Sequence, residues 1–113
     1  MCRQIVEIKP KNLIILDNSE FNLYKINHDL EIIKNEKKIN VKVSAILTSI
    51  QNEHRLIKLF KKYKVQTIYH AAAYKHVPLL ENNIIEGIKN NIIGTKILAK
   101  ISLKFNIENF ILI

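Results

Sequence analysis

Apolar runs with the length of β-strands alternate along this chain with segments of helical periodicity. Leu13–Leu16 is a continuous apolar run, and Val65–Tyr69, Phe110–Ile113 and residues 39–47 are three further strand candidates. Continuous apolarity is typical of strands that are buried on both faces, as in parallel sheets. Strands that alternate with segments long enough to be crossover helices therefore predict an α/β fold with a doubly wound parallel sheet.

The segments between these strands carry helix signals. A short helix is expected near Cys2 and ends before Pro10, because proline cannot continue it. Asn18 or Ser19 can cap a helix that runs to about residue 35, and Asn52 can cap the next one. The last helix is expected from about residue 81 or 82 to 105. The apolar positions that we expect to face the core are Phe21, Tyr24, Ile26, Leu30 and Ile33, then Leu56, Leu59, Phe60 and Tyr63, and finally Ile84, Ile85, Ile88, Ile92, Leu98 and Ile101.

Composition narrows the class of protein. A length of 113 residues allows one domain or part of one, and 48% hydrophobic residues suit a packed core. The net charge of +8 invites a nucleic-acid interpretation, but the lysines are scattered and no aromatic residues interleave with them as a stacking platform requires. We therefore expect no nucleic-acid partner. No apolar run approaches the ~20 residues of a membrane span. The single cysteine, Cys2, and the lack of a signal peptide favour a reducing, cytoplasmic location.

The segment His70–Pro78, with the sequence HAAAYKHVP, directly follows a predicted strand. Three alanines at the end of a strand let a ligand lie directly against the backbone. Ligands of open α/β sheets bind at the carboxyl ends of the strands. The segment is thus either part of a binding site or an ordinary turn with a solvated Lys-His pair.

Asp17 ends the first predicted strand. In dinucleotide-binding folds an acidic residue about 20 positions after a glycine-rich turn binds the ribose hydroxyls. Asp17 has that position, although a carboxylate after a strand is also a common cap or turn residue. The only glycines, Gly87 and Gly94, lie in the last predicted helix, where Gly94 suggests a close backbone neighbour. We therefore expect a truncated Rossmann-like domain over residues 1–113, without the first strand and the glycine-rich loop, as a piece of a larger enzyme.

Three motifs carry a family resemblance. Residues 17–24 (DNSEFNLY), 70–81 (HAAAYKHVPLLE) and 90–95 (NNIIGT) resemble the CapD-like nucleotide-sugar 4,6-dehydratases of bacterial polysaccharide biosynthesis, which are extended short-chain dehydrogenase/reductases. The resemblance covers essentially the whole chain. It implies removal of water from a UDP-linked N-acetylhexosamine, with hydride passing to and from a tightly held NAD or NADP.

The resemblance also assigns site residues. Asp17, Asn18 and Ser19 would contact the adenosine ribose, and the Asp17 carboxylate favours NAD because it would repel a 2′-phosphate. Ser49 and Ile50 would flank the adenine, although many relatives carry Asp at the position of Ser49. His70 and the alanines after it would lie near the cofactor. The resemblance places Ala71, Ala72 and Ala73 beneath the pyrophosphate and ribose of the cofactor. Lys75 would contact the ribose or the substrate, and His76 would lie near the substrate. Asn91 would tie its helix to the active-site strand.

No catalytic residue is expected in this chain. The family uses a Ser or Thr and a Tyr (or Met)-x-x-x-Lys pair that would lie beyond residue 113, and no metal-ligand spacing is present. We expect the chain alone to be inactive and to bind NAD weakly if at all, and the intact enzyme to bind UDP-N-acetylhexosamine and to form homo-oligomers. An epimerase fragment and a non-catalytic α/β interaction module are the alternatives. Asn82, Asn83 and Asn90 are expected to be solvated or capping residues, and His28 and His54 to lie on the surface.

Overall fold

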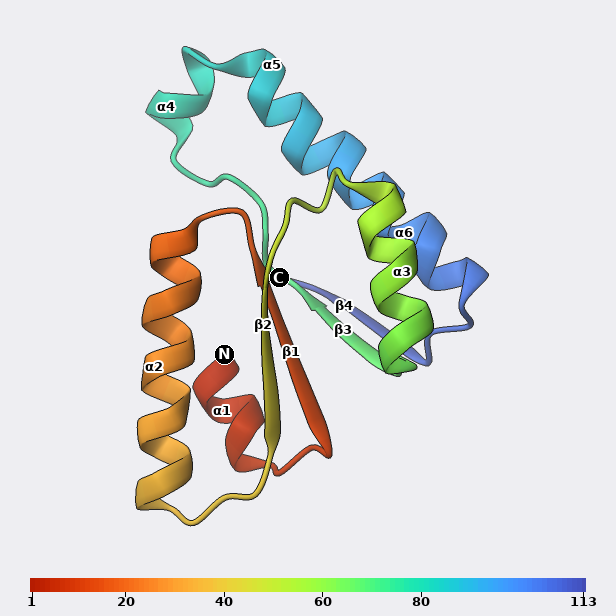
Figure 1. Ribbon diagram of the computed structural model, residues 1–113. Helices are drawn as coiled ribbons and strands as arrows, with labels where there is room; N and C mark the ends of the chain where they lie inside the picture. Colours follow the sequence, from red (N-terminus) through yellow and green to blue (C-terminus); the bar gives the residue numbers. More distant parts are fainter. The chain divides into compact units, whose positions relative to one another are not determined.

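The computed structural model describes residues 1–113, and helices and strands alternate along them (Figure 1). The elements are α1 (Cys2–Glu7), β1 (Asn12–Asp17), α2 (Glu20–Glu36), β2 (Lys42–Leu47), α3 (Glu53–Tyr63), β3 (Thr67–His70), α4 (Val77–Glu81), α5 (Ile84–Gly87), the π-helix η1 (Ile88–Gly94), α6 (Thr95–Lys104) and β4 (Asn109–Leu112). None of the helices combines the length and the apolarity that crossing a membrane requires.

All strand pairs are parallel, so the predicted α/β class is confirmed. β1 pairs with β2 from Asn12↔Lys42 to Asp17↔Leu47, and β3 pairs with β4 from Thr67↔Asn109 to His70↔Leu112. The strands form two two-stranded sheets instead of the single sheet that we expected. In the doubly wound order the central strand precedes the first helix in the chain, and residues 1–113 contain no strand before α1.

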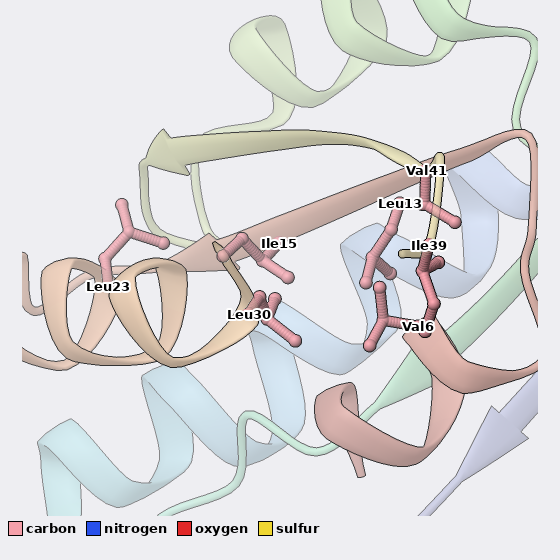
Figure 2. Close-up of a cluster of buried hydrophobic side chains, with 7 residues drawn as sticks. All are labelled: Val6, Leu13, Ile15, Leu23, Leu30, Ile39 and Val41. Carbon is pink, nitrogen blue, oxygen red and sulfur yellow. The ribbon is translucent and has the colours of Figure 1, made fainter. Parts of the chain in front are cut away.

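The chain divides into two compact units, and Met1–Thr48 is the first. Its core is formed by side chains of α1, β1, α2 and the segment that leads into β2 (Figure 2). The side chains of Val6 and Leu30 are fully buried there. Burying each such side chain contributes about 1.5–3 kcal/mol. The core residues are Val6, Leu13, Ile15, Leu23, Leu30, Ile39 and Val41.

Two predicted core residues of α2 are on the surface. Phe21 is 73% exposed and Tyr24 is 72% exposed, whereas Leu23 is buried. The apolar stripe that contacts the sheet passes through Leu23, Ile26, Leu30 and Ile33, which has the i, i+3, i+7 spacing of one helix face. Phe21 and Tyr24 lie beside this stripe, and the Tyr24 ring stacks on His28, with 6.3 Å between the ring centroids.

The second unit, Ser49–Ile113, has its own core. Helices α3 and α6 lie side by side and pack on the β3–β4 sheet (Figure 1). Leu56 and Phe60 from α3 meet Leu98 and Ile101 from α6, as the periodicity predicted. This core anchors the two ends of the segment that carries the HAAAYKHVP motif and the helix after it.

The predicted last helix is divided. Pro78 lies in the first turn of the separate short helix α4, where a missing N–H costs nothing. The continuous helical segment begins at Ile84, and residues 88–94 of it are π-helical. Ile84, Ile85, Ile88 and Ile92 are all at least 45% exposed, so their predicted core positions are wrong. These residues precede the part of the helix that packs on the β3–β4 sheet.

Local signals at helix ends are partly confirmed. The Ser19 hydroxyl accepts from the Asn22 amide at 3.3 Å, and the Asn52 side chain accepts from the Arg55 amide at 3.1 Å. At the other ends, Lys9, Lys38 and Lys64 adopt positive φ angles of 56°, 51° and 47°. Glycine is the usual residue at such positions, and a non-glycine residue pays about 1–2 kcal/mol in steric strain there.

Candidate functional site

His70 is the last residue of β3 and is only 3% exposed. Its Nε2 lies 2.8 Å from the Thr95 hydroxyl on α6, and its ring meets the Phe110 ring edge-on at 6.0 Å between centroids. Burial lowers the pKa of His70 below its ordinary value of 6.5, because the charged imidazolium is poorly solvated there. The structure therefore places the His70 ring inside the second unit, with its backbone at the start of the alanine segment.

The loop of residues 71–76 leaves the carboxyl end of β3 and leads to α4 (Figure 1). Ala71 and Ala72 are exposed and Ala73 is half-buried. Because a methyl group is the largest side chain at these three positions, a ligand could approach the loop backbone closely. The loop thus has the small residues and the position that the sequence predicted.

Two asparagines of η1 hold this loop. The Asn91 side chain accepts from the Tyr74 amide at 2.8 Å and donates to the Tyr74 carbonyl at 2.9 Å. The Asn90 side chain donates to the Ala72 carbonyl at 2.7 Å and to the Asn91 side-chain oxygen at 3.0 Å. Asn91 therefore joins its helix to the loop that follows β3.

The expectation for Asn90 is wrong. Asn90 is 3% exposed, so it is neither solvated nor a capping residue, whereas Asn82 and Asn83 are exposed as expected. Sequence reasoning also missed Thr95, the partner of His70. The available signal for both was the run NNIIGT, in which polar residues interrupt the apolar pattern of a helix.

Lys75 and His76 are both exposed. The Lys75 ammonium donates to the Ile113 backbone oxygen at 3.2 Å, which places its charge near the carboxyl end of β4. His76 is the N-cap residue of α4, and its side chain makes no capping hydrogen bond. The Lys75 side chain therefore reaches the edge of the β3–β4 sheet at which the alanine loop begins.

Asp17, Asn18 and Ser19 lie at the carboxyl end of β1, in the first unit. The Asp17 Oδ1 atom accepts from the Ser19 amide at 2.8 Å, and the Asp17 carbonyl accepts from the Thr48 amide at 2.9 Å. Asp17 thus takes part in the turn that begins α2, while its carboxylate stays partly accessible at the strand end. A side chain held in this way is pre-oriented for a further hydrogen bond.

Ser49 and Ile50 follow β2 and belong to the second unit. The Ser49 hydroxyl accepts from the Gln51 amide at 3.1 Å. The Ile50 side chain packs on Gly94, because a Cβ atom at Gly94 would lie 2.7 Å from Ile50 Cδ1. The close neighbour that Gly94 suggested is therefore present, but it is a side chain and not backbone.

An open, largely apolar groove of about 410 Å³ lies between α4 and the segment formed by α5 and η1. Its walls include Val77, Leu80, Ile84, Ile88 and Asn91. Residues 1–113 contain no cluster of three or more His, Cys, Asp or Glu side chains that could hold a metal ion.

Comparison with known proteins places these features in a family. The family described as polysaccharide biosynthesis protein matches residues 1–113. The chain is 33% identical over 113 residues to the capsular polysaccharide biosynthesis protein CapD of Staphylococcus aureus and 37% identical over 113 residues to the probable polysaccharide biosynthesis protein EpsC of Bacillus subtilis. Each match covers 100% of this chain and 18% of the relative, so the chain spans under a fifth of their length.

Two further matches extend the comparison. An uncharacterized membrane protein of Methanocaldococcus jannaschii is 31% identical over 98% of this chain and 30% of its own length. The X-ray structure of Pen from Bacillus thuringiensis superimposes with a TM-score of 0.79 and 22% identity, over 96% of this chain and 31% of that one. The structural match supports the Rossmann-like fold, and the match over all 113 residues shows that the chain belongs to the polysaccharide biosynthesis protein family.

Proposed function

We propose that this chain is the cofactor-binding part of an NAD-dependent nucleotide-sugar 4,6-dehydratase that acts on a UDP-linked N-acetylhexosamine. The observation that carries the proposal is the loop after β3. Three alanines lie at the carboxyl end of a parallel strand, and asparagines of the next helical segment hold the loop backbone. This is the position at which open α/β sheets bind dinucleotides.

The cofactor contacts that we propose for single residues are those that the family resemblance implies. In the first unit, the Asp17 carboxylate would accept hydrogen bonds from the ribose hydroxyls, with Asn18 and Ser19 beside it. In the second unit, the alanines would lie beneath the pyrophosphate and the second ribose, and Lys75 would supply a cation. Bound NAD would supply a hydride acceptor, while the residues of this chain bind and orient it.

The other predicted contacts belong to the same proposal. Ser49 and Ile50 would flank the adenine, and the His70 backbone would begin the pyrophosphate segment while its ring stays in the core. His76 would lie near the sugar. Because the chain contains no glycine-rich turn to donate backbone hydrogen bonds to the phosphates, we expect a dissociation constant in the millimolar range for residues 1–113.

The test is a titration of the ¹⁵N-labelled chain with NAD and with NADP, followed by NMR. We expect NAD to shift the amide signals of residues 17–19 and 71–75, and NADP to do so less. In Asp17→Asn, affinity for NAD should fall about tenfold or more, because a charged hydrogen bond contributes about 1.5–3 kcal/mol, and the preference for NAD should disappear. Asparagine keeps the Oδ1 acceptor for the Ser19 amide.

Glu20→Gln is the matched control, since Glu20 is an exposed carboxylate in the first turn of α2. It should bind NAD as the unaltered chain does. Equal loss of affinity in both variants would mean that only the general charge near α2 matters. Shifts that avoid both segments would refute the proposed function.

A further inference from the structure

The helix that ends the second unit changes its winding beside the alanine loop. Residues 88–94 are π-helical, between α-helical turns on both sides. Such segments are uncommon and are frequently found at functional sites. The i→i+5 hydrogen bonds of a π-helix turn the backbone less per residue than those of an α-helix. Adjacent side chains, which in an α-helix do not share a face, can therefore reach the same neighbour.

Asn90 and Asn91 are such adjacent side chains. Both reach the loop of residues 71–76, Asn90 at the Ala72 carbonyl and Asn91 at the two backbone groups of Tyr74. Asn90 also donates to the oxygen of Asn91. This second contact favours the amide orientation in which Asn91 accepts from the Tyr74 amide and donates to the Tyr74 carbonyl.

Because Asn90 is buried, the loss of its hydrogen bonds should cost more free energy than the loss of exposed ones. At 3% exposure its amide cannot exchange partners freely with water, and a buried polar group that loses its partner costs more than an exposed one. No buried side-chain nitrogen or oxygen atom in the structure lacks a hydrogen-bond partner. Both hydrogen bonds that the Asn90 side-chain nitrogen donates therefore go to the loop and to Asn91.

We propose that Asn90 is a positioning residue, which together with the π-helical winding of η1 holds the alanine loop in the shape that the cofactor needs. Asn90 acts through the Ala72 carbonyl and through the orientation of Asn91, and it does not touch the cofactor itself. This inference rests on the proposed function for the meaning of the loop's shape. The ordering of the loop can be measured without any cofactor.

The first experiment measures amide hydrogen exchange by NMR in the unaltered chain, in Asn90→Ala and in Asn83→Ala. The Asn83 amide also donates to a backbone carbonyl, that of Leu79 at 2.9 Å, but it is exposed and lies outside the loop. We expect exchange of the Tyr74 amide and its loop neighbours to become about tenfold faster in Asn90→Ala, from the loss of two hydrogen bonds. Asn83→Ala should leave loop exchange unchanged.

Amides of α3 and α6 near the core serve as the internal reference. If Asn90 only stabilised the unit, protection would fall there by the same factor as in the loop. Equal loss in both places, or loop exchange within twofold of the unaltered chain, would overturn the inference.

A second variant, Asn90→Asp, nearly keeps the volume of the side chain and separates positioning from packing. The protonated carboxyl can donate to the Ala72 carbonyl, whereas the ionised one cannot. Because a protonated carboxyl has only one donor, we expect the loop protection factors of this variant to be recovered in part at acid pH, and that part to be lost as the introduced carboxyl ionises. Asn90→Ala should show no such response, and a pH-independent Asn90→Asp would contradict the inference.

Titration of the same variants with NAD distinguishes the two proposals. Reduced loop protection together with weaker NAD shifts in Asn90→Ala supports both. If loop protection falls in Asn90→Ala but the unaltered chain shows no NAD shifts, the role of Asn90 in ordering the loop is supported and the proposed function is refuted. Reduced protection with unchanged NAD affinity would refute the positioning role.

Discussion

The contact between Gly94 and Ile50 allows a quantitative test of how η1 is packed. A Cβ atom at Gly94 would lie 2.7 Å from Ile50 Cδ1, 2.8 Å from Ile50 Cγ1 and 3.5 Å from Gln51 Cγ. Carbon atoms in contact normally stay about 3.5–4.0 Å apart. Substituting Gly94→Ala therefore requires the Ile50 side chain to move by several tenths of an ångström or more, out of a half-buried position.

Two opposing effects determine how Gly94→Ala changes the free energy of unfolding. Alanine is about 1 kcal/mol more favourable than glycine inside a helix, while inserting a methyl group into a packed contact costs about 1–3 kcal/mol. We expect Gly94→Ala to lower the free energy of unfolding by up to about 2 kcal/mol. In an Ile50→Ala background both clashing atoms are gone, so the same substitution should instead stabilise the chain by up to about 1 kcal/mol.

The assay is urea unfolding followed by circular dichroism, for the four chains of the double-mutant cycle. The sign of the Gly94→Ala effect should change between the two backgrounds, with a coupling energy of at least about 1 kcal/mol. Gly87→Ala is the control, because a Cβ atom there would press only on the flexible Leu80 side chain, 2.9 Å from its Cδ2. If Gly94→Ala stabilised both backgrounds equally, the close packing of Ile50 on η1 would be refuted.

Two other properties can be tested in the same way. Burial lowers the pKa of His70 below 6.5, so the unfolded chain binds the proton more readily than the folded chain. The free energy of unfolding should therefore decrease as the pH drops below about 6.5. In His70→Phe this decrease should be smaller. Comparing the free energy of unfolding at neutral and mildly acid pH checks this, and an unchanged pH dependence would contradict it. Lys38 follows α2 with a φ of 51°, so Lys38→Gly should raise the free energy of unfolding by up to about 1 kcal/mol. Lys42→Gly, at an exposed position of β2, should instead lower the free energy of unfolding. If both variants lowered it, residue 38 would not need a positive φ.

Much of the fold could be predicted because its signals are local. The caps at Ser19 and Asn52 depend on a side chain and an amide three residues away. The apolar run at residues 13–16 forms β1 because its alternate residues are buried against α1 and α2. The position of the alanine loop also followed from order alone, since it comes directly after a strand.

The errors concern residues whose surroundings are set by distant parts of the chain. Phe21 and Tyr24 are apolar and lie in a helix, but the direction of the helix relative to the β1–β2 sheet decides that Leu23 is buried in their place. Asn90 looks like a surface residue until η1 and the alanine loop come together. No local pattern marks residues 88–94 as π-helical.

The sequence by itself determined the alternation of strands and helices, the caps and the place of the HAAAYKHVP segment, because hydrophobic period and hydrogen bonding between near neighbours decide them. Only the tertiary structure decided that the strands form two parallel pairs, that the His70 ring is buried and that two adjacent asparagines hold the loop. Each of these depends on contacts between residues 17 or more positions apart, whose free energy is gained only when the elements pack together.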